Sequence, residues 1–116
     1  MATPLIESFT FGRIVVDGQR YLHDLIIYPD RVAAAWRREE GHSLSPADLA
    51  GVIEAGPEVL VIGRGVFARV VVPAETLTAL RAAGIEVIAE PTGSACKTYN
   101  RLREARRVVA ALHISC

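Results

Sequence analysis

The stretch VLVIGRG at residues 59–65 decides the fold of this chain. Its first four residues are all apolar, which is typical of a strand that is buried on both faces of a helix-covered sheet. A second run of this kind, IEVIA at residues 85–89, follows, and Pro73 and Gly84 mark the two ends of a helix between the runs. The pattern predicts a βαβ unit with two parallel strands at the centre of the fold.

Turn residues divide the chain before this unit into short segments. Residues 11–16 and 21–28 are rich in β-branched and aromatic residues, and Asp17-Gly18 between them favours a hairpin turn. Residues 32–36 contain three alanines, which suit a helix, but their position after a Pro-Asp turn favours a strand. We therefore expect an N-terminal β-hairpin followed by a third strand.

Two further helices are indicated by their boundary residues. Ser45-Pro46 is a typical helix start, and Gly56-Pro57 ends that helix. After residues 85–89, Thr92 or Ser94 can cap a last helix, and residues 108–114 form a last apolar strand. The order β-β-β-α-β-α-β-α-β predicts a three-layer α/β domain over residues 9–116, with a mixed central sheet and the hairpin as an accessory layer. Residues 1–8 are expected to form a flexible N-terminal arm.

Composition limits the classes of function. The 116 residues suffice for one domain, and 51% of them are hydrophobic, which supplies one sizeable core. The 13 basic and 13 acidic residues balance, so the chain lacks the global positive charge that is usual in nucleic-acid binders. It also lacks a leader pattern and the roughly 20 apolar residues of a membrane span. These features predict a cytoplasmic protein that binds neither nucleic acid nor membrane.

Residues 63–68 formally match the Gly-x-Gly-x-x-Gly/Ala fingerprint of dinucleotide-binding folds. That fingerprint requires a helix directly after the glycine turn, whereas here a β-branched run and Pro73 intervene. A tight turn that packs closely is therefore the favoured interpretation of the two glycines.

The start of the last helix is the second candidate, because its free amides and dipole favour anions. It follows the carboxyl end of a buried strand, the usual place for ligands in open α/β sheets. Ordinary helix capping remains the favoured role of its hydroxyl groups. Together the two candidates give one hypothetical ligand-binding set: Gly63, Arg64, Gly65, Thr92, Gly93, Ser94, Thr98 and Tyr99.

The remaining reactive side chains form no site that is recognisable in the sequence. Cys96 and Cys116 make neither a disulfide framework nor a metal-ligand spacing, and His23, His42 and His113 lie at no ligand spacing to a cysteine or to each other. No metal and no cofactor is therefore expected. Trp36 is a hypothetical interaction residue, and partial burial in the core is the alternative.

Several short stretches together resemble one family. This is the domain-of-unknown-function family that includes the adipogenesis-associated domain-containing protein and the mitochondrial complex I assembly factor. The similarity runs from about Phe9 to His113. The stretches that carry it are Gly63-Arg64-Gly65 after a buried strand, residues 85–89 before Thr92-Gly93, Thr98-Tyr99-Asn100, Arg107 before residues 108–113, and Trp36 with Gly41-His42.

The resemblance implies a three-layer domain with an additional β-layer, and it brings no accepted enzymatic activity. It also implies binding to other proteins, since eukaryotic members are associated with assembly or differentiation. We therefore expect a non-enzymatic protein-interaction or assembly factor. The alternative is an enzyme or sensor that binds a small anion or nucleotide between the Gly63–Gly65 loop and the helix start at residues 92–98. Catalysis remains open, although the lack of a complete catalytic set speaks against it.

Overall fold

The computed structural model of this chain describes residues 3–116. In its central sheet, β6 (Val59–Arg64) lies between two parallel neighbours, β7 (Glu86–Glu90) and β8 (Val108–His113). On the other side of β8, β4 (Leu25–Tyr28) is antiparallel, and β5 (Arg31–Ala33) pairs antiparallel with β4. The strand order is β5-β4-β8-β6-β7, so the predicted mixed sheet and its parallel βαβ unit are confirmed.

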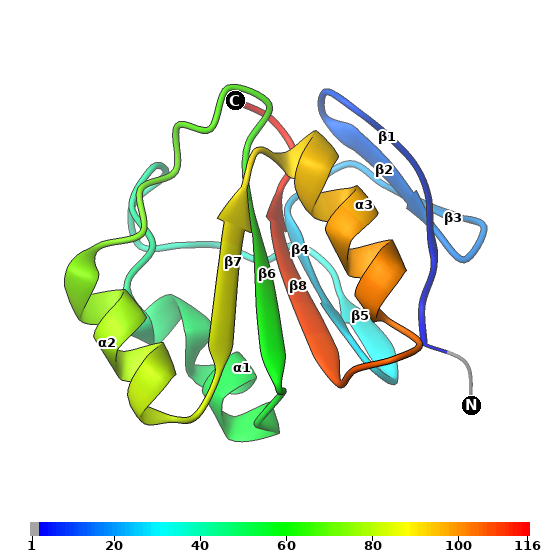
Figure 1. Ribbon diagram of the computed structural model, residues 1–116. Coiled ribbons are helices and arrows are strands. Elements are labelled where there is room, and N and C mark those ends of the chain that lie inside the picture. The colour runs from blue at the N-terminus through cyan, green and yellow to red at the C-terminus, as the bar shows by residue number, and fades with distance from the viewer. Residues whose placement is uncertain (1–2) are drawn as a thin grey trace.

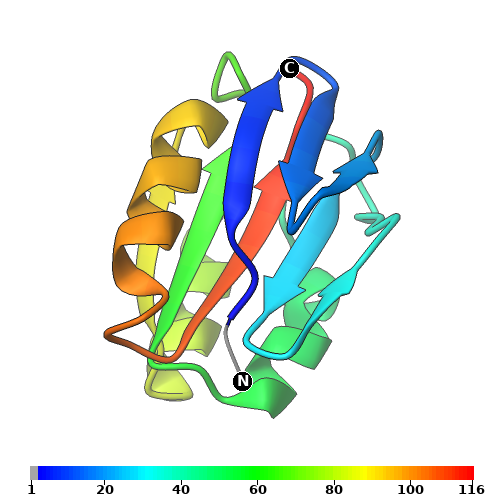
Figure 2. The same ribbon diagram turned by 90° about the vertical axis from the view of Figure 1, so that its right-hand side faces the viewer.

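Helices and a second sheet form the outer layers. The short 3-10 helix η1 (Pro46–Leu49) continues into α1 (Ala50–Ala55), which together with α2 (Ala74–Ala82) covers one face of the central sheet (Figure 1). The other face is covered by α3 (Thr92–Leu102) and a three-stranded antiparallel sheet. Its strands are β1 (Ile6–Thr10), β2 (Arg13–Val16) and β3 (Gln19–Tyr21), and Figure 2 shows this sheet beside α3. The three-layer α/β fold is therefore confirmed.

Side-chain alternation along the central strands explains the uninterrupted apolar runs. In β6, Val59 and Val61 pack on the side of α3 and the small sheet, whereas Leu60 and Ile62 pack on the side of α1 and α2. Strand β8 alternates in the same way, and all six of its residues are buried. Because both faces are covered, these strands are apolar along their length, and polar side chains occur only at their carboxyl ends, at Arg64 and His113.

The predicted hairpin is wrong in its second strand. The Asp17-Gly18 turn does join β2 to β3, but β3 ends at Tyr21 and the chain then crosses to the central sheet as β4. All four residues of β4 are buried, so these side chains need a sheet that is covered on both faces rather than a surface hairpin. The predicted strand at residues 32–36 is likewise shorter, because Ala35 has a positive φ of 56°.

The expected N-terminal arm lies partly in the fold. Ile6 is buried and begins β1, while Pro4 is buried and its carbonyl oxygen accepts a hydrogen bond from Tyr99 at 2.7 Å. For residues 3–8 the expectation of a loose segment is therefore wrong, since long-range contacts hold them to α3. Residues 1 and 2 lie outside the described part of the chain.

The helix boundaries are closer to expectation. Ser45 caps η1 in a capping box with Asp48, and Gly56 ends α1 with a φ of 62°. The predicted cap of α3 is wrong, because the N-cap position is Pro91 and neither Thr92 nor Ser94 makes a capping hydrogen bond there.

Candidate functional site

The two segments of the predicted ligand site do come together. The Thr92 hydroxyl accepts a hydrogen bond from the Gly65 amide at 2.8 Å and donates one to the His113 carbonyl oxygen at 2.6 Å. In addition, the Thr92 amide donates to the Gly65 carbonyl oxygen at 3.1 Å. Thr92 is fully buried. Its hydrogen bonds connect the start of α3 to the carboxyl ends of β6 and β8.

Close packing fills the space at this junction. A Cβ atom at Gly63 would lie 2.9 Å from the Thr92 hydroxyl, and one at Gly65, whose φ is 102°, would lie 2.5 Å from the Cys116 carbonyl group. The two glycines therefore allow neighbouring backbone and side chains to approach. This arrangement is the tight, closely packed turn that was the alternative to a dinucleotide loop.

The other predicted ligand residues point to separate partners. The Arg64 guanidinium donates to the carbonyl oxygens of Val70 and Ala68 within its own loop. Thr98 donates to Glu90 at 2.6 Å, and the buried Tyr99 hydroxyl donates to the Pro4 carbonyl. Burial raises the pKa of Tyr99 out of its usual range, so this hydroxyl stays protonated. Gly93 and Ser94 are exposed at the start of α3.

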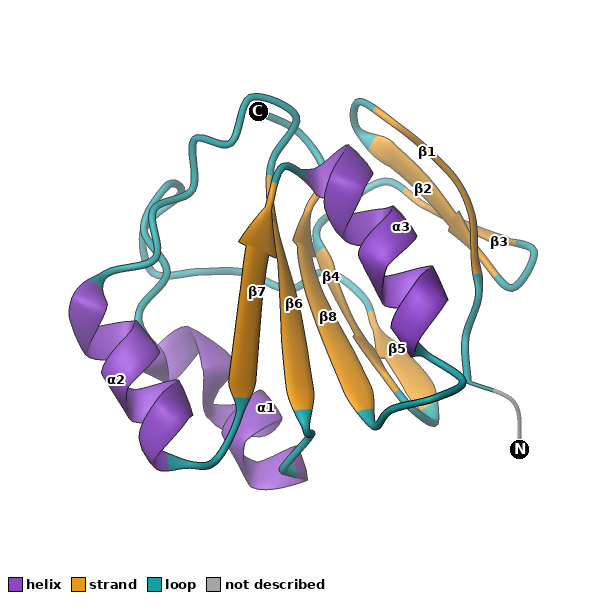
Figure 3. Ribbon diagram, in the orientation of Figure 1, coloured by secondary structure: helices purple, strands orange, loops and turns teal. Residues whose placement is uncertain are grey.

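A different region contains several exposed apolar side chains, which are Phe11, Leu22 and Phe67. It lies at the end of the central sheet where β6 and β8 finish and where the C-terminus lies, and long loops gather there (Figure 3). We define it as the loop face. It consists of the β1–β2 turn, the loop before β4, the loop that follows β5, the loop that follows β6, and residues 114–116.

Residues 114–116 hold the loop face together. The Gly12 amide donates to the Ile114 carbonyl oxygen, and the Val66 amide donates to the Ser115 carbonyl oxygen, both at 2.7 Å. The last described residues thus run between the β1–β2 turn and the loop after β6. As a result, Phe11 and Phe67 meet across the two loops with their ring centroids 6.5 Å apart.

An open groove of about 520 Å³ is lined by Gly12, which follows Phe11 in the β1–β2 turn. Trp36 lines it and donates its indole N–H to the Asp48 carbonyl oxygen at 3.1 Å, which fixes the ring. The Arg38 guanidinium lies 5.1 Å from the centroid of that ring. Leu22 and Arg37, both exposed, lie on the wall of the groove. Trp36 is therefore partly buried and also borders a groove.

Asp24 organises the buried side of this groove. Its carboxylate accepts hydrogen bonds from Arg38 Nη1 at 2.8 Å, from the Ile114 amide at 2.9 Å and from His113 Nδ1 at 2.7 Å. Burial alone would raise the pKa of Asp24, but the hydrogen bonds from His113, Ile114 and Arg38 lower it below its ordinary value. The carboxylate is therefore ionised at neutral pH, and His113 must carry its proton on Nδ1 to donate to it.

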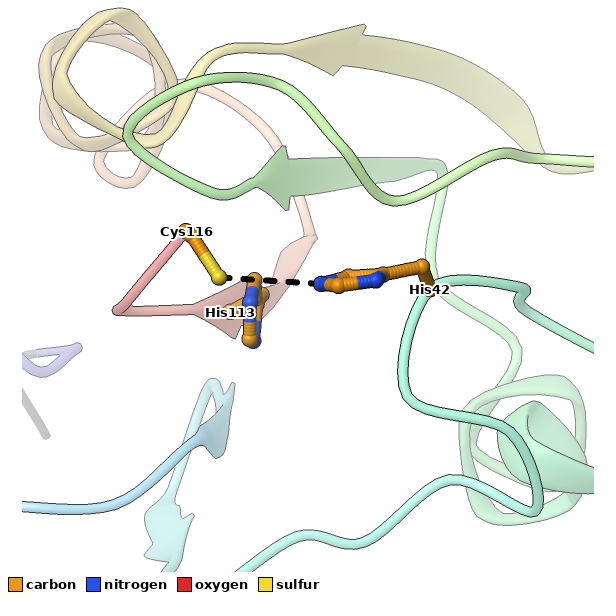
Figure 4. Close-up of side chains that lie close together, drawn as sticks. All are labelled: His42, His113 and Cys116. Carbon is orange, nitrogen blue, oxygen red and sulfur yellow. Dashed lines mark hydrogen bonds between the residues drawn. The ribbon is translucent and has the colours of Figure 1, made fainter.

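Three side chains of the kinds that can bind a metal ion meet next to this network. His42 from the loop after β5, His113 from the end of β8 and Cys116 each place a ligand atom within 4.8 Å of the others (Figure 4). The Cys116 sulfur lies 3.6 Å from His42 Nε2, and the two imidazole rings are nearly perpendicular.

Sequence reasoning missed this cluster because its members come from three distant segments. Residues 42 and 113 have no local spacing, and only the sheet topology brings them together. One signal was present: His113 ends a buried parallel strand and Cys116 follows it, and side chains of functional sites often lie at such carboxyl ends.

Comparison with known proteins places the chain in a family. The family described as "Protein of unknown function (DUF498/DUF598)" matches residues 6–113, which is nearly the whole chain. This chain belongs to that family. The resemblance inferred from the sequence is thereby confirmed, and the family description brings no activity with it.

Relatives share both the sequence pattern and the fold. The chain is similar to the "13 kDa major membrane protein" of Francisella tularensis subsp. holarctica (strain LVS), with 26% identity over 97% of this chain and 92% of that protein. A conserved hypothetical protein from Pyrococcus horikoshii OT3 superposes with a TM-score of 0.85 at 29% identity, over 96% of this chain and 98% of that one. An outer membrane protein from Bartonella henselae gives 0.84 at 25% identity, over 99% and 98%.

Two of these relatives carry names that refer to a membrane. Among residues 3–116 of this chain, no helix combines the length and the apolar character that crossing a bilayer requires. The expected cytoplasmic location stays a prediction.

Proposed function

We propose that this chain is a non-enzymatic protein-interaction module, of the kind that serves assembly, and that its loop face binds an extended segment of a partner protein. The observation that carries the proposal is the exposed aromatic pair beside the groove: Phe11 is 58% exposed and Phe67 is 66% exposed. Exposed apolar side chains that gather at one place mark interaction sites more often than scattered ones do.

The groove supplies the specificity of such a contact. Trp36 offers an aromatic wall fixed by its hydrogen bond, and tryptophan is enriched among residues that dominate binding energy. Leu22 adds an exposed apolar side chain on the same groove. A bulky apolar side chain of the partner fits this concave, partly apolar surface.

Charge defines the second feature of the partner. Asp24 and Arg38 neutralise one another in the groove wall, whereas Arg37 is exposed and has no ion-pair partner within residues 3–116. An acidic group next to the apolar side chain would complement Arg37. The proposed occupant is therefore an extended, acidic protein segment with a bulky apolar residue.

A membrane surface is the competing occupant, because two relatives are named as membrane proteins. A concave groove with a single uncompensated cation favours a protein segment over a flat lipid surface. Binding of a small anion or nucleotide between Gly65 and Thr92 is not favoured by a specific observation, since the polar atoms of Thr92 are used within the chain.

The proposal is tested by comparing three proteins as bait in affinity capture from cell extract, followed by calorimetry with each captured protein in purified form. The baits are the unmodified chain, the double variant Phe11→Ser/Phe67→Ser and the control Leu5→Ser. Leu5 is also exposed but lies outside the loop face. We expect a purified partner whose affinity falls at least about tenfold with the double variant, or about 1.4 kcal/mol, and is unchanged with Leu5→Ser.

The same proteins are then mixed with anionic lipid vesicles and with a panel of nucleotides and acidic metabolites. Binding to vesicles that depends on the two phenylalanines, without a protein partner, would replace the proposal with a membrane role. A ligand that raises the melting temperature of the unmodified chain and loses this effect in Thr92→Ala would support the anion-binding alternative instead.

A further inference from the structure

We propose that His42, His113 and Cys116 bind one Zn²⁺ ion at the loop face. The three side chains are the nitrogen and sulfur ligands that zinc prefers, and each has a ligand atom within 4.8 Å of the others. The inference is independent of the proposed partner contact, because Phe11, Phe67 and Trp36 are not ligands.

The distances suit a tetrahedral site. Zinc–nitrogen bonds of about 2.0–2.1 Å and zinc–sulfur bonds of about 2.3 Å place a nitrogen and a sulfur ligand about 3.6 Å apart at the tetrahedral angle. The Cys116 sulfur lies 3.6 Å from His42 Nε2. This pair therefore already has the separation of two ligands of one zinc ion.

The third ligand needs only a small adjustment. Separations within 4.8 Å must shorten by at most about 1.4 Å to reach tetrahedral values. His42 and Cys116 both lie outside the buried cores, so small rotations of the two side chains bring them closer to His113 and keep their own separation. His113 is 7% exposed and stays in place as the fixed ligand.

Asp24 prepares His113 for this role. Its carboxylate lies 2.7 Å from His113 Nδ1, and a proton on Nδ1 that donates to Asp24 leaves the Nε2 lone pair for a metal ion. A carboxylate that fixes the outer nitrogen in this way is the usual companion of a zinc-bound histidine. The Arg38 guanidinium lies on the Nδ1 side, with Nη2 at 3.1 Å from Nδ1, and Asp24 balances its charge there. On the other side of the ring, the Ser115 hydroxyl lies 3.4 Å from Nε2 and would give way to the ion.

Three protein ligands leave the fourth position of the ion open. In zinc proteins such a position is taken by water or by an exogenous ligand. The site therefore belongs to the open class rather than to the closed, four-ligand structural class.

The experiment measures zinc binding to the metal-free, reduced protein by competition with a chromophoric chelator. We expect one equivalent of Zn²⁺ per chain. Loss of a residue that only hydrogen-bonds to a metal ligand typically lowers metal affinity roughly 10- to 100-fold. His42→Ala and Cys116→Ser each remove a ligand itself, so each should lower the affinity for Zn²⁺ by more than this. His23→Ala, which removes an exposed histidine outside the cluster, should leave the affinity unchanged.

Cobalt replaces zinc in a second measurement that reports the ligands directly. The Co²⁺ protein should show a thiolate-to-cobalt absorption band in the near ultraviolet, and Cys116→Ser should abolish it. Neither His42 nor Cys116 belongs to the two buried cores, so these variants should fold, and circular dichroism checks this. The proposal is overturned if the unmodified chain binds Zn²⁺ no more tightly than Cys116→Ser, or if the absorption band is missing.

Discussion

At the scale of single residues, Thr92 shows how far the sequence leads. Its position after a buried strand correctly predicts that it lies near the Gly63–Gly65 loop. Its hydroxyl, however, serves the Gly65 amide and the His113 carbonyl oxygen rather than a helix cap or a ligand. A local pattern could not reveal this role, because one of the two partners lies 21 residues further along the chain.

Replacing Thr92 with valine preserves its shape and removes both hydrogen bonds. The buried amide of Gly65 and the carbonyl group of His113 would lose this partner, and each unsatisfied group costs about 1–3 kcal/mol. We expect the free energy of unfolding in urea to fall by about 2–4 kcal/mol. Thr78→Val, an exposed change on α2, should stay within about 0.5 kcal/mol. Equal free energies of unfolding for Thr92→Val and Thr78→Val would contradict a stabilising role of the Thr92 hydroxyl.

Cys96 is a buried residue that packs among apolar side chains in the core. Burial raises its pKa from the ordinary value of 9.0 to about 12. The unfolded chain therefore loses this thiol proton first as the pH rises. Between about pH 9 and pH 12, the contribution of Cys96 to the stability of the folded chain should decrease with increasing pH.

The same pKa predicts a difference in reactivity between the two cysteines. At pH 8 the thiolate that attacks alkylating reagents is almost absent at Cys96, and this residue is also shielded. Mass spectrometry should find one rapidly alkylated thiol in the folded protein, at Cys116, and two in urea. Cys116→Ser should then show almost no rapid labelling. Rapid labelling of Cys96 in the folded chain would disprove its burial.

At the scale of elements, α3 explains the run Thr98-Tyr99-Asn100 that carries the family resemblance. Each of the three side chains holds α3 to a different segment: Thr98 to Glu90 on β7, Tyr99 to Pro4, and Asn100 to Ile6 on β1. The side-chain amide of Asn100 both accepts from the Ile6 amide and donates to the Ile6 carbonyl oxygen. It thereby takes the place of a neighbouring strand beside β1.

Asn100→Ala should therefore loosen β1 more than it disturbs α3. The loss of two hydrogen bonds of about 0.5–1.5 kcal/mol each predicts a decrease in unfolding free energy of about 1–3 kcal/mol. Hydrogen exchange should accelerate most at Ile6 and its neighbours. Arg101→Ala, an exposed change on the same helix, is the matched control. Unchanged exchange at Ile6 in the Asn100 variant would show that β1 is held by other contacts.

The elements also show where the sequence is a poor guide. The strands β6, β7 and β8 and the βαβ order were predictable, because continuous apolar runs and Pro/Gly boundaries mark them clearly. The division of residues 21–28 between two sheets was not, since the turn between β3 and β4 has no strong turn signal. Likewise β1 is half exposed and lacks a clear alternation, so its pairing with β2 and its contacts with α3, rather than its own pattern, identify it as a strand.

At the scale of the whole molecule, the topology places segments that are far apart in the sequence at one end of the central sheet. The β1–β2 turn, the loops after β5 and β6, and residues 114–116 all meet at the loop face (Figure 1). Family membership and the three-layer fold followed from the sequence, but this convergence required the structure. It moves the candidate site from the start of α3 to the groove beside Trp36 and to the His42–His113–Cys116 cluster.

Hydrogen–deuterium exchange with and without a captured, purified partner tests most directly that the loop face is the functional surface. We predict slower exchange at residues 11–12, 35–38, 66–68 and 114–116 on binding, and no change at residues 93–97 at the start of α3. Protection confined to residues 93–97, with the loop face unchanged, would contradict the account.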